Sequence, residues 1–190
     1  MTMPGSDGRI RCAWAGDPSL DPLYAAYHDD EWGVPVHGRS ALFERITLEA
    51  FQSGLSWITI LRKREAFRAA FRGFDPALVA QFGEDDVERL MSDSAIVRNR
   101  AKITATVRNA RAVVDQDIDL DAVLWSFAPP ARPRPSTLTD VPAVTAESTA
   151  LARTLKKAGL SFVGPTTAYA LMQATGMVDD HVADCWVPAR

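Results

Sequence analysis

Cysteine is scarce in this sequence, and long apolar runs are absent. Only Cys12 and Cys185 occur among 190 residues, too few for a disulfide-stabilised scaffold. No apolar stretch approaches the roughly 20 residues that a transmembrane helix needs. The N-terminal MTMPGSDGRI also lacks the basic region and apolar core of a secretion or import signal. We therefore expect a cytoplasmic protein that does not associate with membranes.

A net positive charge is missing as well. The formal net charge is −3, which gives no overall attraction to nucleic acid, so DNA binding would depend on local clusters. Basic residues do gather, in LRKREAFRAAFRG (61–73) and in IVRNRAKITATVRNARA (96–112). The sequence leaves open whether these clusters bind a ligand or are simply solvated helix faces.

The pattern of apolar residues predicts an all-α fold. Hydrophobic residues make up 47% of the chain, enough for one core but over too short a chain for two. They recur at helical spacing, as at Leu42, Phe43, Ile46 and Ala50. Helix start and stop signals follow one another at Asp75–Pro76 and Gly83, at Glu147 and Gly159, and at Pro165 and Gly176. We expect seven or more helices, with no strand and no internal repeat.

Two segments are expected to lie outside the helices. Residues 1–10 are expected to be a flexible N-terminus, and residues 11–190 to form a single domain. FAPPARPRPST, residues 127–137, contains too much proline for a helix and predicts a surface connection. Its proline-rich part, residues 129–135, has no role that the pattern can assign.

Two of the three histidines lie near a cysteine. DDHVADC places His181 and Cys185 four residues apart, which would stack them on one face of a helix, and Cys12 is followed by His28 in AYHDDEWG. Two cysteines and two histidines make a complete tetrahedral set for one structural zinc ion, with no open position. Such a site would join the N- and C-terminal regions.

Other interpretations of these residues remain open at this point. The cysteines could form a disulfide, which a reducing cytosol disfavours, or be buried thiols unrelated to the histidines. Asp29, Asp30 and Glu31 follow His28 and could contribute to a hydrolytic metal centre. A full Cys₂His₂ set would leave that centre no place for an activated water. His37 has no metal-ligand neighbour and is interpreted as an exposed loop residue.

An acidic residue and several aromatic residues form the second candidate site. LEAFQSGLSWITIL, residues 48–61, places Glu49 in an otherwise apolar run that includes Trp57. The first third of the chain also contains Trp14, Tyr24, Tyr27 and Trp32. Each aromatic residue taken singly is more typical of a core. Together with a carboxylate, they suit a flat, nitrogen-rich ligand that stacks on the rings and donates hydrogen bonds to the acid.

Five motifs carry a resemblance to a known family. RCAW, DPLYAAYHDDEWGVP, LFERITLEAFQSGLSWITIL, FVG with AYALMQATG, and DDHVADC, which span residues 11–185, resemble in order those of the 3-methyladenine DNA glycosylase I family. The resemblance implies a zinc-stapled helical fold of the helix-hairpin-helix DNA glycosylase superfamily. Its implied zinc ligands are Cys12, His28, His181 and Cys185. Its implied base pocket is lined by Trp14, Tyr27, Trp32, Glu49 and Trp57.

The resemblance also implies a reaction. The enzyme would flip 3-methyladenine out of alkylated double-stranded DNA and hydrolyse its N-glycosidic bond in base-excision repair, releasing the free base. Ionised Glu49 would be the catalytic residue, accepting a hydrogen bond from the adenine amino edge. No lysine stands out as a Schiff-base nucleophile, so we expect a monofunctional enzyme that leaves an abasic site without cutting the strand. We expect it to act as a monomer.

DNA contacts are expected on two segments. Leu55, between Gly54 and Ser56, is the candidate wedge that fills the gap left by the flipped base, although a leucine is often a core residue. SDSAIVRNRAKI, residues 92–103, is in register with the family's DNA-binding hairpin, where Arg98, Arg100 and Lys102 would contact phosphates. The family pattern commonly has glycine where Ala95 and Ala101 stand here.

A second function remains possible from sequence alone. A non-catalytic, zinc-stabilised helical module that binds nucleic acid would also explain the metal set, the basic clusters and the aromatic residues. The intact Glu49 favours the glycosylase, since a carboxylate repels phosphate and has no use in a simple DNA-binding surface.

Overall fold

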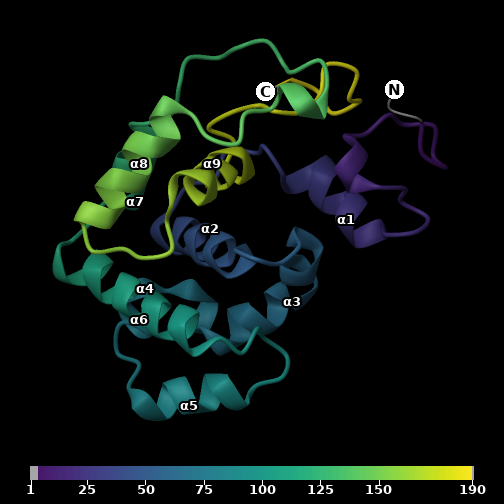
Figure 1. Cartoon of the computed structure of the whole chain (residues 1–190). Coiled ribbons are helices and arrows are strands. Elements are labelled where there is room, and N and C mark those ends of the chain that lie inside the picture. Colours follow the sequence, from purple (N-terminus) through teal and green to yellow (C-terminus); the bar gives the residue numbers. More distant parts are fainter. Residues whose placement is uncertain (1–3, 190) are drawn as a thin grey trace.

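Helices form most of the described part of the chain, residues 4–189, in this computed structural model (Figure 1). Within that range there are nine α-helices and, apart from one isolated bridge between Pro4 and Ile10, no β-structure. The helices are α1 (Pro22–Ala26), α2 (Arg39–Gln52), α3 (Trp57–Ala70), α4 (Pro76–Val79), α5 (Glu84–Ser92), α6 (Arg100–Asp115), α7 (Leu120–Trp125), α8 (Ala146–Lys157) and α9 (Pro165–Ala174). The prediction of an all-α fold is confirmed.

Helix α2 lies at the centre of the fold. It contacts α3, α6, α7 and α9, and Figure 1 shows it between α9 on one side and α4 and α6 on the other. Every residue from Leu42 to Phe51 is therefore buried, rather than one face of the helix alone. Because a helix surrounded on all sides has no solvated face, a carboxylate at Glu49 is carried into the interior.

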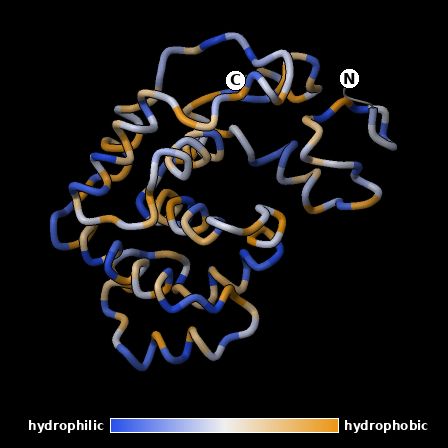
Figure 2. The backbone as a smooth tube through the Cα atoms, viewed as in Figure 1, coloured by the Kyte–Doolittle hydropathy of each residue, from blue (hydrophilic) through white to orange (hydrophobic). Residues whose placement is uncertain are grey.

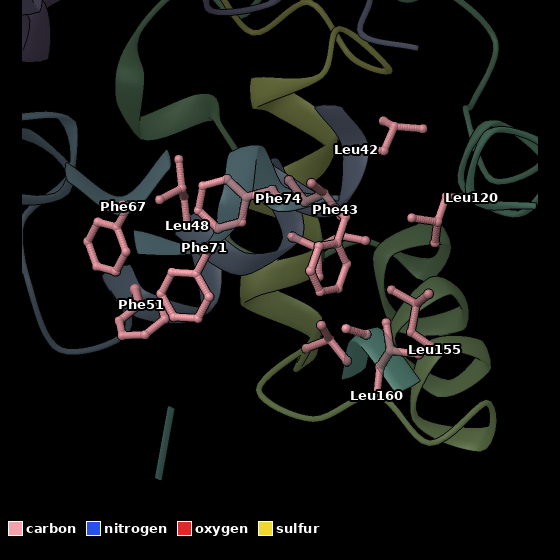
Figure 3. Packing of buried hydrophobic residues seen from close by; sticks show 14 of the residues in the cluster. Leu42, Phe43, Leu48, Phe51, Phe67, Phe71, Phe74, Leu120, Leu155 and Leu160 are labelled. Atoms are coloured by element: carbon pink, nitrogen blue, oxygen red, sulfur yellow. The ribbon is translucent and has the colours of Figure 1, made fainter. Parts of the chain in front are cut away.

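Phenylalanine side chains fill the core beside α2. Phe51 lies 4.7 Å from Phe67 between ring centroids, and Phe71 stacks on Phe74 at 5.6 Å. Figure 3 shows these four rings grouped together. Burying each such side chain contributes about 1.5–3 kcal/mol. The cluster therefore fixes the end of α2 next to α3, where the chain turns at residues 53–56.

Local sequence signals place several helix ends where they were predicted. Asp75 caps α4 by accepting a hydrogen bond from Ala77 N at 2.8 Å, and Pro76 is the first residue of that helix. Gly176, after the end of α9, has a φ of +75°, and a Cβ atom there would lie 2.7 Å from Pro35 N. Only glycine fits this position without displacing the neighbouring backbone.

The proline-rich connection runs alongside the C-terminal segment. In Figure 1 this green stretch of chain passes close to the yellow C-terminus. Arg134 joins the two, because its guanidinium donates to Asp179 Oδ2 at 2.8 Å and to Val187 O at 2.7 Å. Residues 127–137 contain no helix, as predicted.

The N-terminal segment was expected to be flexible over residues 1–10. Residues 1–3 lie outside the described part of the chain. Residues 4–10 form a turn in which Gly5 N donates to Arg9 O at 2.9 Å, while Ser6 N donates to Asp17 Oδ2 at 2.7 Å. The described part of this segment is thus hydrogen-bonded to itself and to Asp17.

Hydrophilic and hydrophobic residues alternate within the helices, as Figure 2 shows. None of the helices in residues 4–189 is both long enough and apolar enough to cross a membrane.

Candidate active site and metal centre

Four predicted metal ligands meet in a buried cluster. One ligand atom from each of Cys12, His28, His181 and Cys185 lies within 4.8 Å of the others. Cys185 Sγ is 3.5 Å from both His28 Nε2 and His181 Nδ1, and Cys12 Sγ is 3.8 Å from His181 Nδ1. Both thiols are free, so the alternative of a disulfide does not hold in this structure.

The cluster has the dimensions and surroundings of a metal site. Ligands about 2.0–2.3 Å from a tetrahedral ion are separated from one another by about 3.3–3.8 Å, close to the distances observed. His28 Nδ1 bonds Asp29 Oδ1 at 2.8 Å, and His181 Nε2 bonds Trp32 O at 3.2 Å. Such bonds orient metal-binding imidazoles, and they leave Nε2 of His28 and Nδ1 of His181 facing the cluster. The residues therefore fit one four-coordinate metal ion.

The carboxylates after His28 do not join the cluster. Asp29 is engaged by His28, by Arg11 at 2.7 Å and by Trp186. Glu31 forms ion pairs with Arg64 and Arg45. This leaves no carboxylate-rich hydrolytic centre at these residues.

One expectation about the cluster is wrong. The spacing of His181 and Cys185 predicted a helix, but the described residues after α9 contain none. A turn in which Cys185 N donates to Val182 O at 2.9 Å brings the two side chains together instead. On the other side, His28 belongs to a π-helical turn, η2 (Tyr27–Glu31), that directly continues α1.

The predicted pocket residues line one cavity of about 380 Å³. Trp14, Tyr27, Trp32, Glu49 and Trp57 all contribute to its wall. The rings pack at close range: Tyr27 and Trp57 lie 5.3 Å apart between centroids, and Trp14 and Trp32 lie 5.0 Å apart. The structure thus brings together all the side chains that the sequence assigned to the pocket.

The aromatic wall is shared with the metal cluster. Trp32 lies 4.7 Å from the His181 ring, and Trp14 lies 5.1 Å from the His28 ring, both in edge-on geometry. Because the same indoles face the cavity and the histidines, the position of the pocket wall depends on the cluster behind it.

Two buried polar atoms in this pocket are left without a hydrogen-bond partner among the described residues. They are Glu49 Oε2, an acceptor when ionised, and Trp57 Nε1, a donor. Leaving such groups unpaired costs about 1–3 kcal/mol each. A ligand that offers both a donor and an acceptor would satisfy both atoms.

The ionisation state of Glu49 depends on its burial. Burial raises the pKa of its carboxyl to about 8, and the nearby Arg45 offsets only part of this effect. Without a cationic partner the protonated form of Glu49 is therefore favoured at neutral pH. A positively charged ligand would favour the carboxylate form.

Tyr24, which the sequence placed in the aromatic group but not among the residues implied by the family resemblance, also lines the cavity. The cavity wall further contains residues that sequence reasoning missed: Gln52, Leu138, Val141, Pro142, Ala143, Thr166, Tyr169, Ala170 and Gln173. Tyr169 and Gln173 stand four residues apart on α9, in the AYALMQ motif, so helical spacing could have paired them. The segment 138–143 offered no such signal.

Among the candidate DNA-contacting residues, Leu55 and Arg98 are exposed, whereas Arg100 is engaged in ion pairs. Leu55 is 41% exposed and lines a second cavity of about 230 Å³. Glu49 and Gln52 line both this cavity and the aromatic base cavity. Arg98 is exposed, while Arg100 forms ion pairs with Glu84 and Glu88 on α5.

The prediction that Lys102 contacts phosphate is not supported. Lys102 is only 8% exposed, and its ammonium donates to Phe51 O at 2.9 Å and to Ser53 O at 2.7 Å. It therefore satisfies carbonyl groups at the C-terminal end of α2.

The fold and the site define a class of all-helical proteins in which an aromatic and acidic cavity lies beside a Cys₂His₂ cluster. A family model described as methyladenine glycosylase matches residues 14–188. The chain belongs to this family.

Individual relatives agree with that assignment. The chain is 49% identical to DNA-3-methyladenine glycosylase 1 of Escherichia coli, over 92% of this chain and 95% of that protein. It is 44% identical to DNA-3-methyladenine glycosylase of Haemophilus influenzae, over 92% and 96%. The crystal structure of a 3-methyladenine DNA glycosylase I superposes with a TM-score of 0.89 at 46% identity, covering 94% of this chain and all of the other.

Proposed function

We propose that the protein hydrolyses the N-glycosidic bond of 3-methyladenine in alkylated double-stranded DNA, releases the free base and leaves an abasic site. The observation that carries this proposal is the pair of unpartnered atoms, Glu49 Oε2 and Trp57 Nε1, which belong to two residues that line the aromatic cavity. An extruded adenine offers both an amino donor and ring-nitrogen acceptors. The cavity of about 380 Å³ also falls within the usual range for small ligands.

Charge explains how the pocket would choose the damaged base. Methylation at N3 gives the purine in DNA a positive charge, which weakens the glycosidic bond and stabilises the leaving group. The ring faces of Tyr27 and Trp57 favour such a cation by about 0.5–2 kcal/mol per contact. Glu49 would release its proton to solvent water as the cation enters, and its negative charge would then stabilise the positive charge that develops on the sugar.

The cavity lining supports a monofunctional reaction. In the described part of the chain no lysine lines either the base cavity or the cavity beside Leu55. A Schiff base with the sugar needs such an amine, so water is the expected nucleophile and the strand is left uncut.

The metal cluster would play a structural part. Two thiolates and two imidazoles suit zinc and fill its four positions, which leaves no site for an activated water. Cys12, His28, His181 and Cys185 would hold the ion and join the two ends of the chain, while catalysis takes place in the neighbouring pocket.

DNA would approach at the turn between α2 and α3. Leu55 is exposed there, and Thr166 and Thr167 at the start of α9 line the same cavity. Backbone N–H groups at a helix start favour phosphate. Arg98 remains a candidate phosphate contact, and the effect of Ala95 and Ala101 on affinity stays a prediction, as do the monomeric state and the cytoplasmic location.

The assay that tests the function measures release of 3-methyladenine from methylated DNA by chromatography. Glu49→Gln and Trp57→Ala should each reduce release at least about tenfold, because each removes a group that contacts the base. Glu44→Gln is the matched control: Glu44 is also buried on α2 but is paired with Arg68. It should excise at nearly the wild-type rate.

Two results would contradict the proposal. Tight binding of methylated DNA with no release by the wild-type protein would favour the non-catalytic module. Equal activity of the wild-type, Glu49→Gln and Trp57→Ala proteins would show that the pocket is wrongly assigned.

A further inference from the structure

The side of the base cavity formed by α9 is organised around one buried carboxylate. Tyr169 and Gln173 both line the cavity. The Tyr169 hydroxyl donates to Asp180 Oδ2 at 2.5 Å, and Gln173 Nε2 donates to the same oxygen at 2.9 Å. The Asp180 side chain is completely buried.

The charge of Asp180 is balanced by a residue of the proline-rich connection. Arg132 Nη2 donates to Asp180 Oδ1 at 2.8 Å and to the Tyr169 hydroxyl at 2.7 Å. A buried carboxylate without a cation would be strongly destabilising. Residues 127–137, whose pattern indicated only a surface connection, thus supply a guanidinium to the far side of the cavity wall.

The chemistry of a carboxylate fixes the direction of these hydrogen bonds. An ionised Asp180 only accepts, so Gln173 must present its NH₂ group and Tyr169 its proton to it. The amide of Gln173 is then held with its carbonyl oxygen on the side away from Asp180. Glu49 lines the cavity and has no arginine in hydrogen-bond contact, whereas Asp180 lies behind the cavity wall and is paired with Arg132.

We propose that Asp180 is a positioning residue for the base pocket, and that with Arg132 it fixes the orientation of Tyr169 and Gln173 toward the bound base. This inference rests on the proposed function. It assigns the selection of the base partly to α9, in addition to the aromatic residues near the N-terminus.

A neighbouring pair of residues provides a matched control. Asp179 pairs with Arg134, which comes from the same proline-rich connection, with Nε and Oδ2 2.8 Å apart. Neither Asp179 nor Arg134 lines the cavity. The two pairs therefore join the same segments of chain, and only one of them contacts pocket residues.

The experiment compares Asp180→Asn with Asp179→Asn, and Arg132→Gln with Arg134→Gln. The affinity for free 3-methyladenine is measured by calorimetry, together with KM and kcat on methylated DNA, metal content and thermal unfolding. Asp180→Asn turns an amide toward two donors, so affinity should fall about tenfold or more. Arg132→Gln should weaken binding in the same direction, whereas the Asp179 and Arg134 variants should stay within about twofold of wild type.

A double-mutant cycle separates positioning from a general structural effect. Gln173→Met keeps the volume of the side chain and removes its amide. If Asp180 acts through Gln173, the two substitutions together should cost less affinity than the product of their separate effects.

The inference is overturned if the Asp180 and Asp179 variants lose the same affinity, or if the effects of Asp180→Asn and Gln173→Met multiply in full. If Asp180→Asn fails to fold, the arginine variants provide the test. Equal affinities of Arg132→Gln and Arg134→Gln for free 3-methyladenine would contradict the inference. A wild-type protein that neither binds nor releases 3-methyladenine would instead contradict the proposed function itself.

Discussion

The Sγ atom of Cys185 lies 3.5 Å from the Nε2 atom of His28, although 157 residues separate the two along the chain. This contact, with Cys12 and His181 beside it, joins the N-terminal aromatic segment to the irregular C-terminal segment. Those segments lack regular secondary structure long enough to hold themselves together, so we expect the metal cluster to contribute much of their stability.

Removal of one metal ligand should therefore release the ion and destabilise the fold. With the proposed zinc ion held by this cluster, Cys185→Ser is expected to reduce the metal content from one ion per chain to almost none. It should lower the melting temperature by roughly 10 °C, because several kcal/mol of metal binding are lost. Metal analysis and calorimetry measure the two effects.

His37→Ala is the control for this prediction. His37 is exposed and pairs with Asp121 at 2.7 Å, outside the cluster. Its variant should keep the full metal content. Unchanged metal content in Cys185→Ser would show that the cluster is not the metal site.

The buried carboxyl of Glu49 predicts a pH-dependent stability. Its pKa is raised by burial from an ordinary value of 4.5 to about 8 in the folded protein. Between these two values the unfolded chain ionises this group while the folded protein keeps it protonated. The free energy of unfolding should therefore fall as the pH rises from about 4.5 to about 8, and this contribution should become constant above that range.

Glu49→Gln isolates this contribution, because glutamine fills the same space without titrating. The variant should gain stability relative to wild type across the same range, by up to a few kcal/mol. Urea unfolding of both proteins at pH 5, 6.5 and 8 tests the expectation. If the difference in free energy of unfolding between the two proteins stays constant over these pH values, Glu49 titrates normally in the folded protein.

Sequence signals were sufficient to predict helix ends, because the chemistry that determines them is local. Asp75 with Pro76 marked the start of α4, and Gly176 marked the end of α9, because capping and positive φ depend on a few adjacent residues. The all-α class followed from apolar spacing. The family motifs supplied the residues of the pocket and the metal cluster.

Other features depend on contacts that no local pattern records. His181 and Cys185 share a turn instead of a helix. The pKa of Glu49 follows from the burial of α2 on all sides, which one helical stripe did not indicate. Helical spacing could have paired Tyr169 with Gln173, but no local pattern indicates the hydrogen bond from Arg132, 37 residues earlier in the chain, to Tyr169.

Lys102 and Arg98 are basic residues of one segment that should behave differently. Lys102→Met removes hydrogen bonds to the end of α2 and is expected to destabilise the protein by about 1–3 kcal/mol. It should leave the salt dependence of DNA binding unchanged. Arg98→Met should leave stability nearly unchanged and, by removing a phosphate contact, reduce the slope of log affinity against log salt by about 1.

Binding titrations at several salt concentrations, with urea unfolding of both variants, separate these two roles. A reduced salt slope for Lys102→Met would restore the original expectation that Lys102 contacts phosphate. An unchanged slope for Arg98→Met would move the phosphate contacts elsewhere, with the start of α9 as the next segment to test.

Leu55 should act on DNA and not on the free base. Its side chain is 41% exposed on the turn between α2 and α3, and its neighbour Gly54 has a φ of +83° that keeps the turn tight. Leu55→Ala shortens the wedge, so a flipped base should return to the duplex more readily. We expect excision from double-stranded DNA to fall about tenfold or more, while the affinity for free 3-methyladenine and the melting temperature stay near their wild-type values. Leu78→Ala, at an equally exposed leucine (45%) on α4, is the control and should excise normally. If Leu55→Ala excises as fast as this control, the wedge is another residue, because an exposed apolar side chain that fills the gap in the duplex cannot be shortened without loss.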